Sequence, residues 1–151
     1  MPVILLIAAI LTAAYGVPAM ELFDHSPVYS AFSGFDPIVV ADGSQFFQLE
    51  ESAPVQFRSR LVYLIPPQNV PVGDPTNQHE VMRWKTIVPN LPVENASEFL
   101  RTHSRFYVLD ERTADDTPAT YLLKEQRIDQ WRIVNGAVLY RSHPAAPAGS
   151  W

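Results

Sequence analysis

The chain of 151 residues contains no cysteine, and its first twenty residues contain no charged side chain. The lack of cysteine excludes disulfides, thiolate zinc sites and cysteine nucleophiles. The first lysine or arginine is Arg58, and six acidic residues precede it. With a formal net charge of −5, the sequence lacks the basic clusters that nucleic-acid phosphates require. We therefore expect no nucleic acid among the partners.

The uncharged stretch at residues 1–20 is the most informative part of the sequence. It contains the apolar run Val3 to Ile10, and charge first appears at Glu21. At about 1.5 Å of rise per helical residue, such a stretch just crosses the hydrocarbon core of a bilayer. Lysine and arginine mark the cytoplasmic flank of a span, and the flank here has none before Arg58. These features predict a transmembrane helix with the remaining chain on the extracytoplasmic, periplasmic-type side of the lipid bilayer.

A cleaved signal peptide is the main alternative for the same stretch. The apolar core is suitable, and Val17-Pro18-Ala19 fits a small-x-small cleavage site. The basic region that normally opens a signal peptide is missing, because only Met1 and Pro2 precede the run. Both interpretations place the domain outside the cytoplasm, whereas a third, a buried helix of a soluble protein, does not.

The remaining residues predict one domain with short flanking segments. Residues 21–36 mix aromatic residues with serine, glycine and proline, which indicates a linker or interfacial segment, or equally a packed loop. Residues 37–142 are expected to form the extracytoplasmic domain, which is long enough to bury a core. Residues 143–151 are expected to be a flexible tail.

Hydrophobic patterning within the domain predicts an α/β fold. Continuous apolar runs predict buried strands, spacing of three and four residues predicts helices, and Asn135-Gly136 between apolar runs predicts a hairpin. The expected strands are 37–41, 60–65, 105–109, 131–134 and 137–140, and the expected helices are 45–52, 77–88, 95–103 and 120–130. The alternation predicts a small Rossmann-like, three-layer domain with a parallel core sheet and a C-terminal antiparallel hairpin.

Two finer expectations concern the helix at 77–88 and the segment that follows 105–109. Helical spacing predicts that five apolar side chains of that helix face the core: Val81, Met82, Trp84, Ile87 and Val88. Residues 110–118 are polar and acidic, which predicts an exposed loop.

Candidate ligand-binding residues stand where two predicted strands end, because ligands of open α/β sheets gather at the carboxyl ends of the strands. These residues are Asp42, Ser44 and Asp110. The structural alternatives are that Asp42 or Ser44 caps a helix and that Asp110 opens a solvated acidic loop. The glycine fingerprint of dinucleotide sites, helical histidine pairs and a nucleophile elbow are all missing. No catalytic, cofactor-binding or metal-binding residue is therefore predicted, and no cofactor is expected.

The order of sequence blocks resembles the C-terminal extracytoplasmic domain, with the last membrane helix, of bacterial multi-span glycosyltransferases. The blocks are P-I-V-V-A-D-G-S-Q-F-F-Q-L at 37–49, S-R-L-V-Y-L-I at 59–65, R-F-Y-V-L at 105–109 and Y-L-L at 121–123. That family resembles the dolichyl-phosphate-mannose mannosyltransferases and uses polyprenyl-phosphate sugars. Its catalytic acid lies in the first extracytoplasmic loop of the multi-span portion, and this chain has no such loop.

The resemblance implies an accessory function without catalytic residues. The chain would position the acceptor or the polyprenyl-phosphate sugar, and the multi-span portion, missing or encoded separately, would be its partner. The alternative is a secreted or anchored α/β binding module with a cleaved signal peptide. A soluble oxidoreductase or hydrolase is disfavoured because the phosphate fingerprint and nucleophile motifs are missing.

Overall fold

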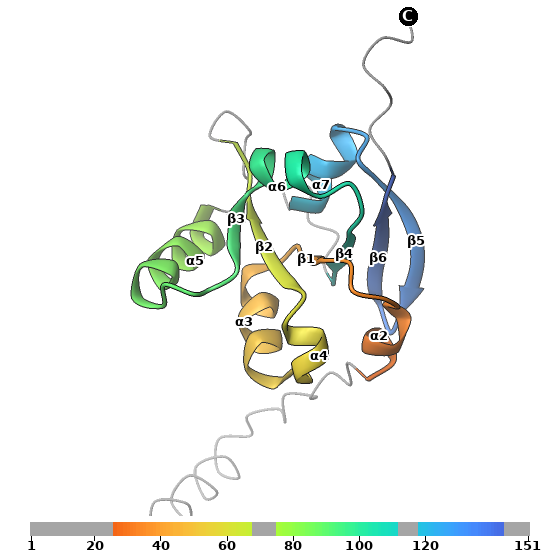
Figure 1. The fold of residues 1–151 in the computed structure, drawn as a ribbon, viewed down its shortest axis with the longest axis horizontal. Coiled ribbons are helices and arrows are strands. Elements are labelled where there is room, and N and C mark those ends of the chain that lie inside the picture. Colours follow the sequence, from red (N-terminus) through yellow and green to blue (C-terminus); the bar gives the residue numbers. More distant parts are fainter. Residues whose placement is uncertain (1–25, 68–74, 112–117, 144–151) are drawn as a thin grey trace, which may run out of the picture.

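The structure, a computed structural model, describes residues 26–67, 75–111 and 118–143. It is a mixed α/β domain built on a six-stranded sheet with strand order β3-β2-β1-β4-β6-β5 (Figure 1). The strands are β1 (Ile38–Val40), β2 (Leu61–Ile65), β3 (Val93–Asn95), β4 (Tyr107–Asp110), β5 (Ile128–Val134) and β6 (Ala137–Ser142). The helices are α2 (Ser26–Ala31), α3 (Gly43–Ser52), α4 (Val55–Arg58), α5 (Pro75–Ile87), α6 (Ala96–Thr102) and α7 (Pro118–Lys124).

The core of the sheet is parallel and one end is an antiparallel hairpin, as the sequence predicts. Strand β1 pairs in parallel with β2 and β4, and β2 pairs in parallel with β3. Strand β6 pairs antiparallel with both β4 and β5. Asn135 and Gly136 connect the hairpin with φ values of 48° and 83°, which is the conformation that an Asn-Gly turn favours.

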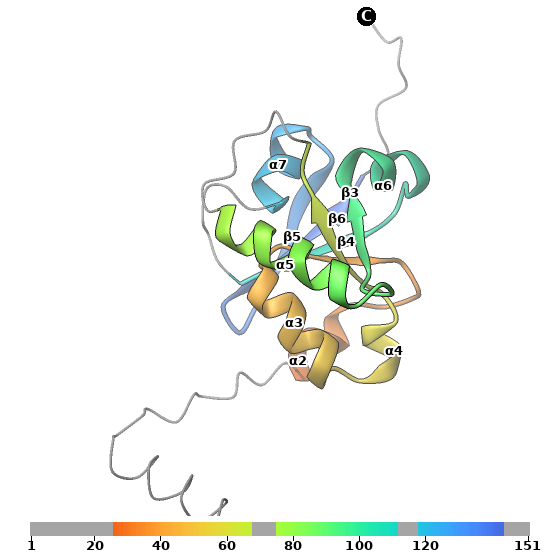
Figure 2. The ribbon, with the colours of Figure 1, turned by 90° about the vertical axis from the view of Figure 1, so that its left-hand side faces the viewer.

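Helices cover both faces of the sheet because the buried strands are apolar on both sides. One face packs against α2, α3, α4 and α5, through side chains such as Phe46 and Leu49 of α3. The other face packs against α6 and α7, through Phe99 and Leu122. Figure 2 shows α3 and α5 side by side in front of the sheet, and the two helices contact each other.

Several sequence predictions need correction where tertiary contacts outweigh local pattern. Strand β3, which has three residues and pairs with β2 at the edge of the described sheet, is not predicted from the sequence. The helix predicted over 120–130 ends at Lys124. There Gln126 takes a left-handed φ of 50°, and the Arg127 N–H donates back to the Leu122 carbonyl at 2.9 Å, so the last turn is closed by a C-terminal cap. Residues from Ile128 onward belong to β5.

The prediction that five apolar side chains of the helix at 77–88 face the core is wrong for four of them. Val81 is fully buried, whereas four are exposed: Met82, Trp84, Ile87 and Val88. Trp84 still contacts Phe47 of α3, with a ring-centroid distance of 5.9 Å. Asp110, placed by sequence in an exposed loop, is instead the last residue of β4 and is 4% exposed. Residues 112–117 of that predicted loop lie outside the described residues.

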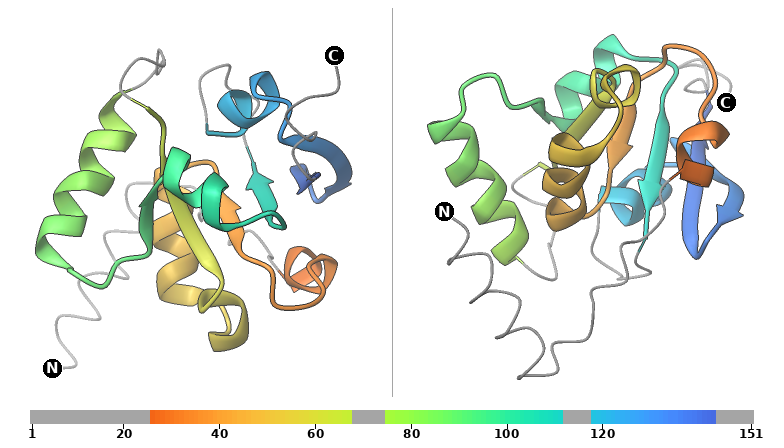
Figure 3. Two further views of the ribbon diagram at one scale, coloured as in Figure 1. Left: turned by 45° about the horizontal axis from the view of Figure 1, so that its top comes forward. Right: turned by 90° about the horizontal axis from the view of Figure 1, so that it is seen from below.

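Helix α2 lies within the segment that the sequence assigns to a linker or packed loop. Its Val28 is fully buried, and the following Phe32 packs against Tyr107 at the start of β4, with ring centroids 5.2 Å apart. The guanidinium of Arg60 donates to the Asp36 and Phe32 carbonyls at 2.9 and 3.2 Å, which holds the connection to β1. Both views of Figure 3 show α2 near the hairpin, away from α5. Helix α2 and the residues that follow it therefore dock at the end of the sheet where β4 begins.

No helix in the described ranges is long and apolar enough to cross a membrane. The stretch for which the sequence predicts a span, residues 1–20, lies outside those ranges, as does most of the predicted tail at 143–151.

Candidate functional site

The connections of the sheet diverge at β1 and β4, and this is where polar residues gather. The chain proceeds from β1 outward through β2 and β3, and then returns to place β4 on the other side of β1. Such a point leaves space at the carboxyl ends of the two central strands. Here a hollow of about 70 Å³ is lined by five polar residues: Asp42, Ser44, Gln45, Gln48 and Glu111. This hollow, called the switch-point hollow below, is the candidate functional site.

Asp42 forms one wall of the hollow and also begins helix α3. Its backbone is extended, and its Oδ1 accepts hydrogen bonds from the Gln45 N–H at 2.9 Å and from Ser44 Oγ at 2.5 Å. The structural alternative stated for Asp42, a helix N-cap, is therefore confirmed. A cap of this type contributes about 1 kcal/mol. Asp42 is 7% exposed, and the two donors hold its carboxylate in a fixed position in the wall of the hollow.

Gln45 is the unusual side chain of the site. It is only 4% exposed, and neither its Oε1 nor its Nε2 has a hydrogen-bond partner in the described part of the chain. Three residues after the N-cap, a glutamine can reach back to the backbone N–H of the cap residue, but Gln45 Oε1 does not make that bond. A buried polar group left unpaired costs about 1–3 kcal/mol of folding stability. Because the Gln45 amide makes no hydrogen bond that offsets this cost, we expect it to serve a purpose other than stabilising the fold.

The structure separates two of the predicted site residues, Asp42 and Asp110. Successive side chains of β4 point to opposite faces, and Leu109 lies on the α3 face, so Asp110 faces the α6 and α7 side. Burial raises the pKa of Tyr140 on that side, and the Asp110 carboxylate adds to the rise. Asp110 does not line the switch-point hollow, whereas its neighbour Glu111 does.

Tyr63 of β2 lies beside Asp42 on the α3 face of the sheet. Burial raises the pKa of its phenol to about 12, with a further contribution from the negative charge of Asp42. The phenol is therefore neutral at physiological pH.

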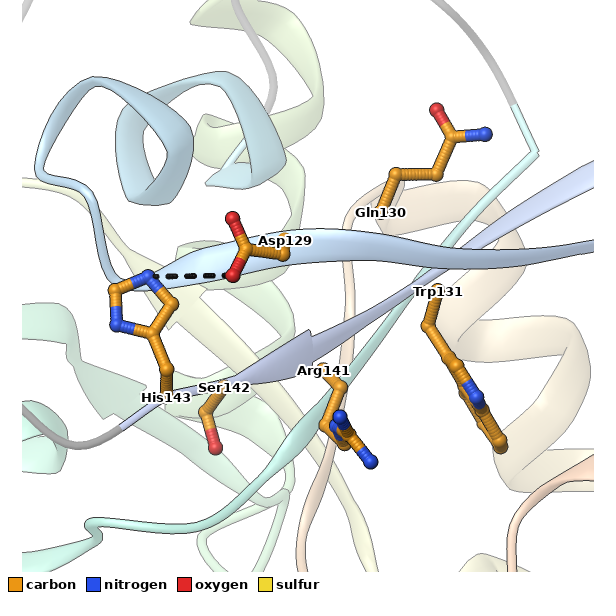
Figure 4. A pocket seen from close by; sticks show the side chains of 6 residues that line it. All are labelled: Asp129, Gln130, Trp131, Arg141, Ser142 and His143. Carbon is orange, nitrogen blue, oxygen red and sulfur yellow. Dashed lines mark ion pairs between the residues drawn. The ribbon is translucent and has the colours of Figure 1, made fainter.

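A second hollow, of about 160 Å³, lies on the β5–β6 hairpin. Six residues line it: Asp129, Gln130, Trp131, Arg141, Ser142 and His143. Figure 4 shows His143 directed toward Asp129, with 3.8 Å between His143 Nε2 and Asp129 Oδ2, while Gln130 points to the opposite side from Trp131. The Trp131 ring already has Tyr107 at 5.5 Å and the Arg132 guanidinium at 5.2 Å. The indole is thus engaged within the protein and is a poor platform for a ligand.

No protein-family model, curated protein or solved structure matches the chain. What the switch-point hollow can bind therefore follows from the side chains that line it. It offers two carboxylates, one hydroxyl and two amides, and none of the described residues that line it is lysine, arginine or histidine. The described residues contain no group of three or more acidic, histidine or cysteine side chains placed to hold a metal ion.

Asp42 and Ser44 are predicted from the sequence as candidates, Glu111 falls in the segment predicted to be an exposed acidic loop, and Gln45 and Gln48 are not predicted. Gln48 is one helical turn after Gln45 on α3, so both face the same end of the sheet. The signal available in the sequence is the spacing Asp42-x-x-Gln45, which puts an amide in the first turn of a helix after a buried strand. Whether such an amide caps the helix or is left unpaired depends on tertiary packing.

Proposed function

We propose that this chain is the membrane-anchored, extracytoplasmic domain of a lipid-linked-sugar glycosyltransferase. In this proposal it positions the acceptor or the donor, and the catalytic residues belong to a multi-span portion that is missing or separate. The observation that carries the proposal is the order of segments, in which the uncharged stretch 1–20 precedes the blocks at 37–49, 59–65 and 105–109.

The arrangement of those blocks in the sheet supports the proposal. They contain β1, β2 and β4, which are adjacent in the parallel part of the sheet. We also propose that the domain is Rossmann-like. The Rossmann fold has the strand order 3-2-1-4-5-6, and the order β3-β2-β1-β4 matches the first four positions of that series. The missing glycine fingerprint argues for a ligand other than a dinucleotide.

The positions of α2 and of the hollow support a positioning function. Helix α2 follows the N-terminal stretch in sequence, and Phe32, the residue after the helix, packs against Tyr107 at the amino end of β4. The hollow lies at the opposite end of the same strand, next to Glu111. The hollow and the contact of Phe32 therefore lie at opposite ends of β4, and the polar lining of the hollow suits a hydrophilic acceptor or the sugar part of a donor.

Sugar transfer by the isolated chain tests this division of labour. The chain is expressed alone in membranes and assayed with a radiolabelled polyprenyl-phosphate sugar and a set of acceptors. We expect transfer no higher than in membranes without the chain, because the proposal assigns the catalytic residues to the multi-span portion. Robust transfer that Asp42→Asn or Glu111→Gln abolishes would contradict the proposal.

The second candidate is a secreted or anchored binding module, and Val17-Pro18-Ala19 favours it through its small-x-small pattern. Mass spectrometry of the intact protein from the membrane and soluble fractions distinguishes the two. A product that begins at Met1 supports the retained anchor, whereas a product that begins at Met20 supports the cleaved module.

A further inference from the structure

We propose that the switch-point hollow binds a neutral, hydroxyl-rich ligand, such as one edge of a sugar ring, and that the Gln45 side-chain amide recognises a hydroxyl of that ligand. The inference relies on the proposed function in one respect, namely that the domain positions a carbohydrate. The observation behind it is an amide that lines the hollow, is 4% exposed and has both polar atoms unpaired within the described residues.

The unpaired amide requires a partner that both donates and accepts. Gln45 Nε2 needs an acceptor, and Gln45 Oε1 needs a donor. A hydroxyl group supplies both, and a pair of neighbouring hydroxyls supplies them at adjacent positions. An anion would satisfy only Nε2, and a metal cation only Oε1.

The charges around the hollow select against anions. Helix α3 has ten residues, and its N-terminus alone would favour an anion. The cap position, however, is already occupied by the Asp42 carboxylate, and Glu111 adds a second acidic side chain to the lining. With no cationic side chain among the described lining residues, a phosphate would meet two carboxylates.

The size of the hollow limits how much of the ligand enters. A volume of about 70 Å³ accommodates several water-sized polar groups but is far below the 300–1,000 Å³ of sites that enclose a whole drug-sized ligand. Gln48, the exposed glutamine one turn further along α3, lies at the rim. One ring edge would therefore enter, and the rest of the saccharide would remain in solvent.

The test uses the full chain in detergent micelles and follows the glutamine side-chain NH₂ signals by ¹⁵N–¹H NMR. The Gln45 signal is assigned from its disappearance in Gln45→Met. The probes are methyl α-mannoside, methyl α-glucoside and methyl α-galactoside at millimolar concentration, with sodium phosphate and magnesium chloride in separate samples. We expect at least one glycoside to shift the Gln45 signal saturably, while phosphate and magnesium leave it in place.

Ligand-observed saturation-transfer measurements on the variants complete the test. Gln45→Met should weaken glycoside binding about tenfold or more, since one well-placed hydrogen bond is worth roughly that factor. The matched control is Gln130→Met, which alters the hairpin hollow and should leave binding unchanged. A saturable shift by phosphate or magnesium, unchanged binding in Gln45→Met, or no glycoside binding would overturn the inference. Because the proposed function is tested by sugar transfer and by membrane topology, it can stand or fall separately.

Discussion

Replacing Gln45 with methionine should make the ligand-free protein more stable. Methionine is an unbranched side chain of similar length and similar helix propensity, so the backbone of α3 and the packing around it are kept. The substitution removes two buried polar atoms that have no hydrogen-bond partner in the described part of the chain. Most buried substitutions destabilise a protein, so the predicted direction is unusual and informative.

The magnitude follows from the cost of burying unpaired polar groups. Each such group costs about 1–3 kcal/mol, and the two atoms belong to one amide whose desolvation is shared, so we expect a gain of about 1–3 kcal/mol in unfolding free energy. For a domain of this size that corresponds to a rise in Tm of roughly 4–12 °C.

Urea denaturation of the full chain in detergent, followed by tryptophan fluorescence, measures the effect. The control is Gln48→Met on the same helix, where the side chain is exposed and the change should stay within about 0.5 kcal/mol. If Gln45→Met lowers the unfolding free energy by more than about 1 kcal/mol, the amide has a structural partner, and the argument that it is reserved for a ligand is refuted.

Substitutions at three further positions test the local geometry. Asp42→Ala should cost about 1–2 kcal/mol in urea denaturation because the α3 cap is lost, whereas Asp42→Asn, which can still accept from the Gln45 N–H, should cost a few tenths. Because the Tyr63 pKa is raised to about 12, the folded state binds that proton more tightly than the unfolded state, and stability is lost between pH 10 and pH 12. When unfolding is measured at both pH values, Tyr63→Phe should remove that part of the alkaline loss, which is about 1.4 kcal/mol between pH 8 and pH 11 because pH 11 lies about one pKa unit into the window. Gln126→Gly should raise stability by about 0.5–1 kcal/mol in thermal unfolding, since glycine takes the left-handed φ of 50° without strain, and a decrease would contradict the assigned cap.

Elements with a strong local signal are the ones that sequence reasoning finds. Apolar, β-branched runs identify β1, β2 and β4, and the Asn135-Gly136 pair identifies the hairpin turn. Asn95 is a residue type that favours helix N-caps, and it caps α6, where its Oδ1 accepts from the Ser97 N–H at 2.9 Å. In each case the local pattern and the tertiary contacts favour the same structure, so the local pattern alone is enough to predict the element.

The elements that sequence reasoning misses depend on distant contacts. Strand β3 is three residues long and is specified by its pairing with β2, and Ile128 enters β5 because it pairs with β6. Apolar spacing on α5 overstates its burial, since only Val81 meets the core. At the site, Asp110 and Glu111 are adjacent in sequence, and only the pleat of β4 decides which of them faces the hollow.

The membrane side on which the domain lies is the most direct test of the central claim. The native chain has no cysteine, so Gln56→Cys on exposed α4 introduces a single thiol with no background. Intact spheroplasts that express this variant are treated with a membrane-impermeant maleimide, before or after lysis, and a cytoplasmic protein with one exposed cysteine serves as the control. Labelling of the introduced thiol before lysis, with the control unlabelled, is the predicted result; labelling only after lysis would contradict an extracytoplasmic domain.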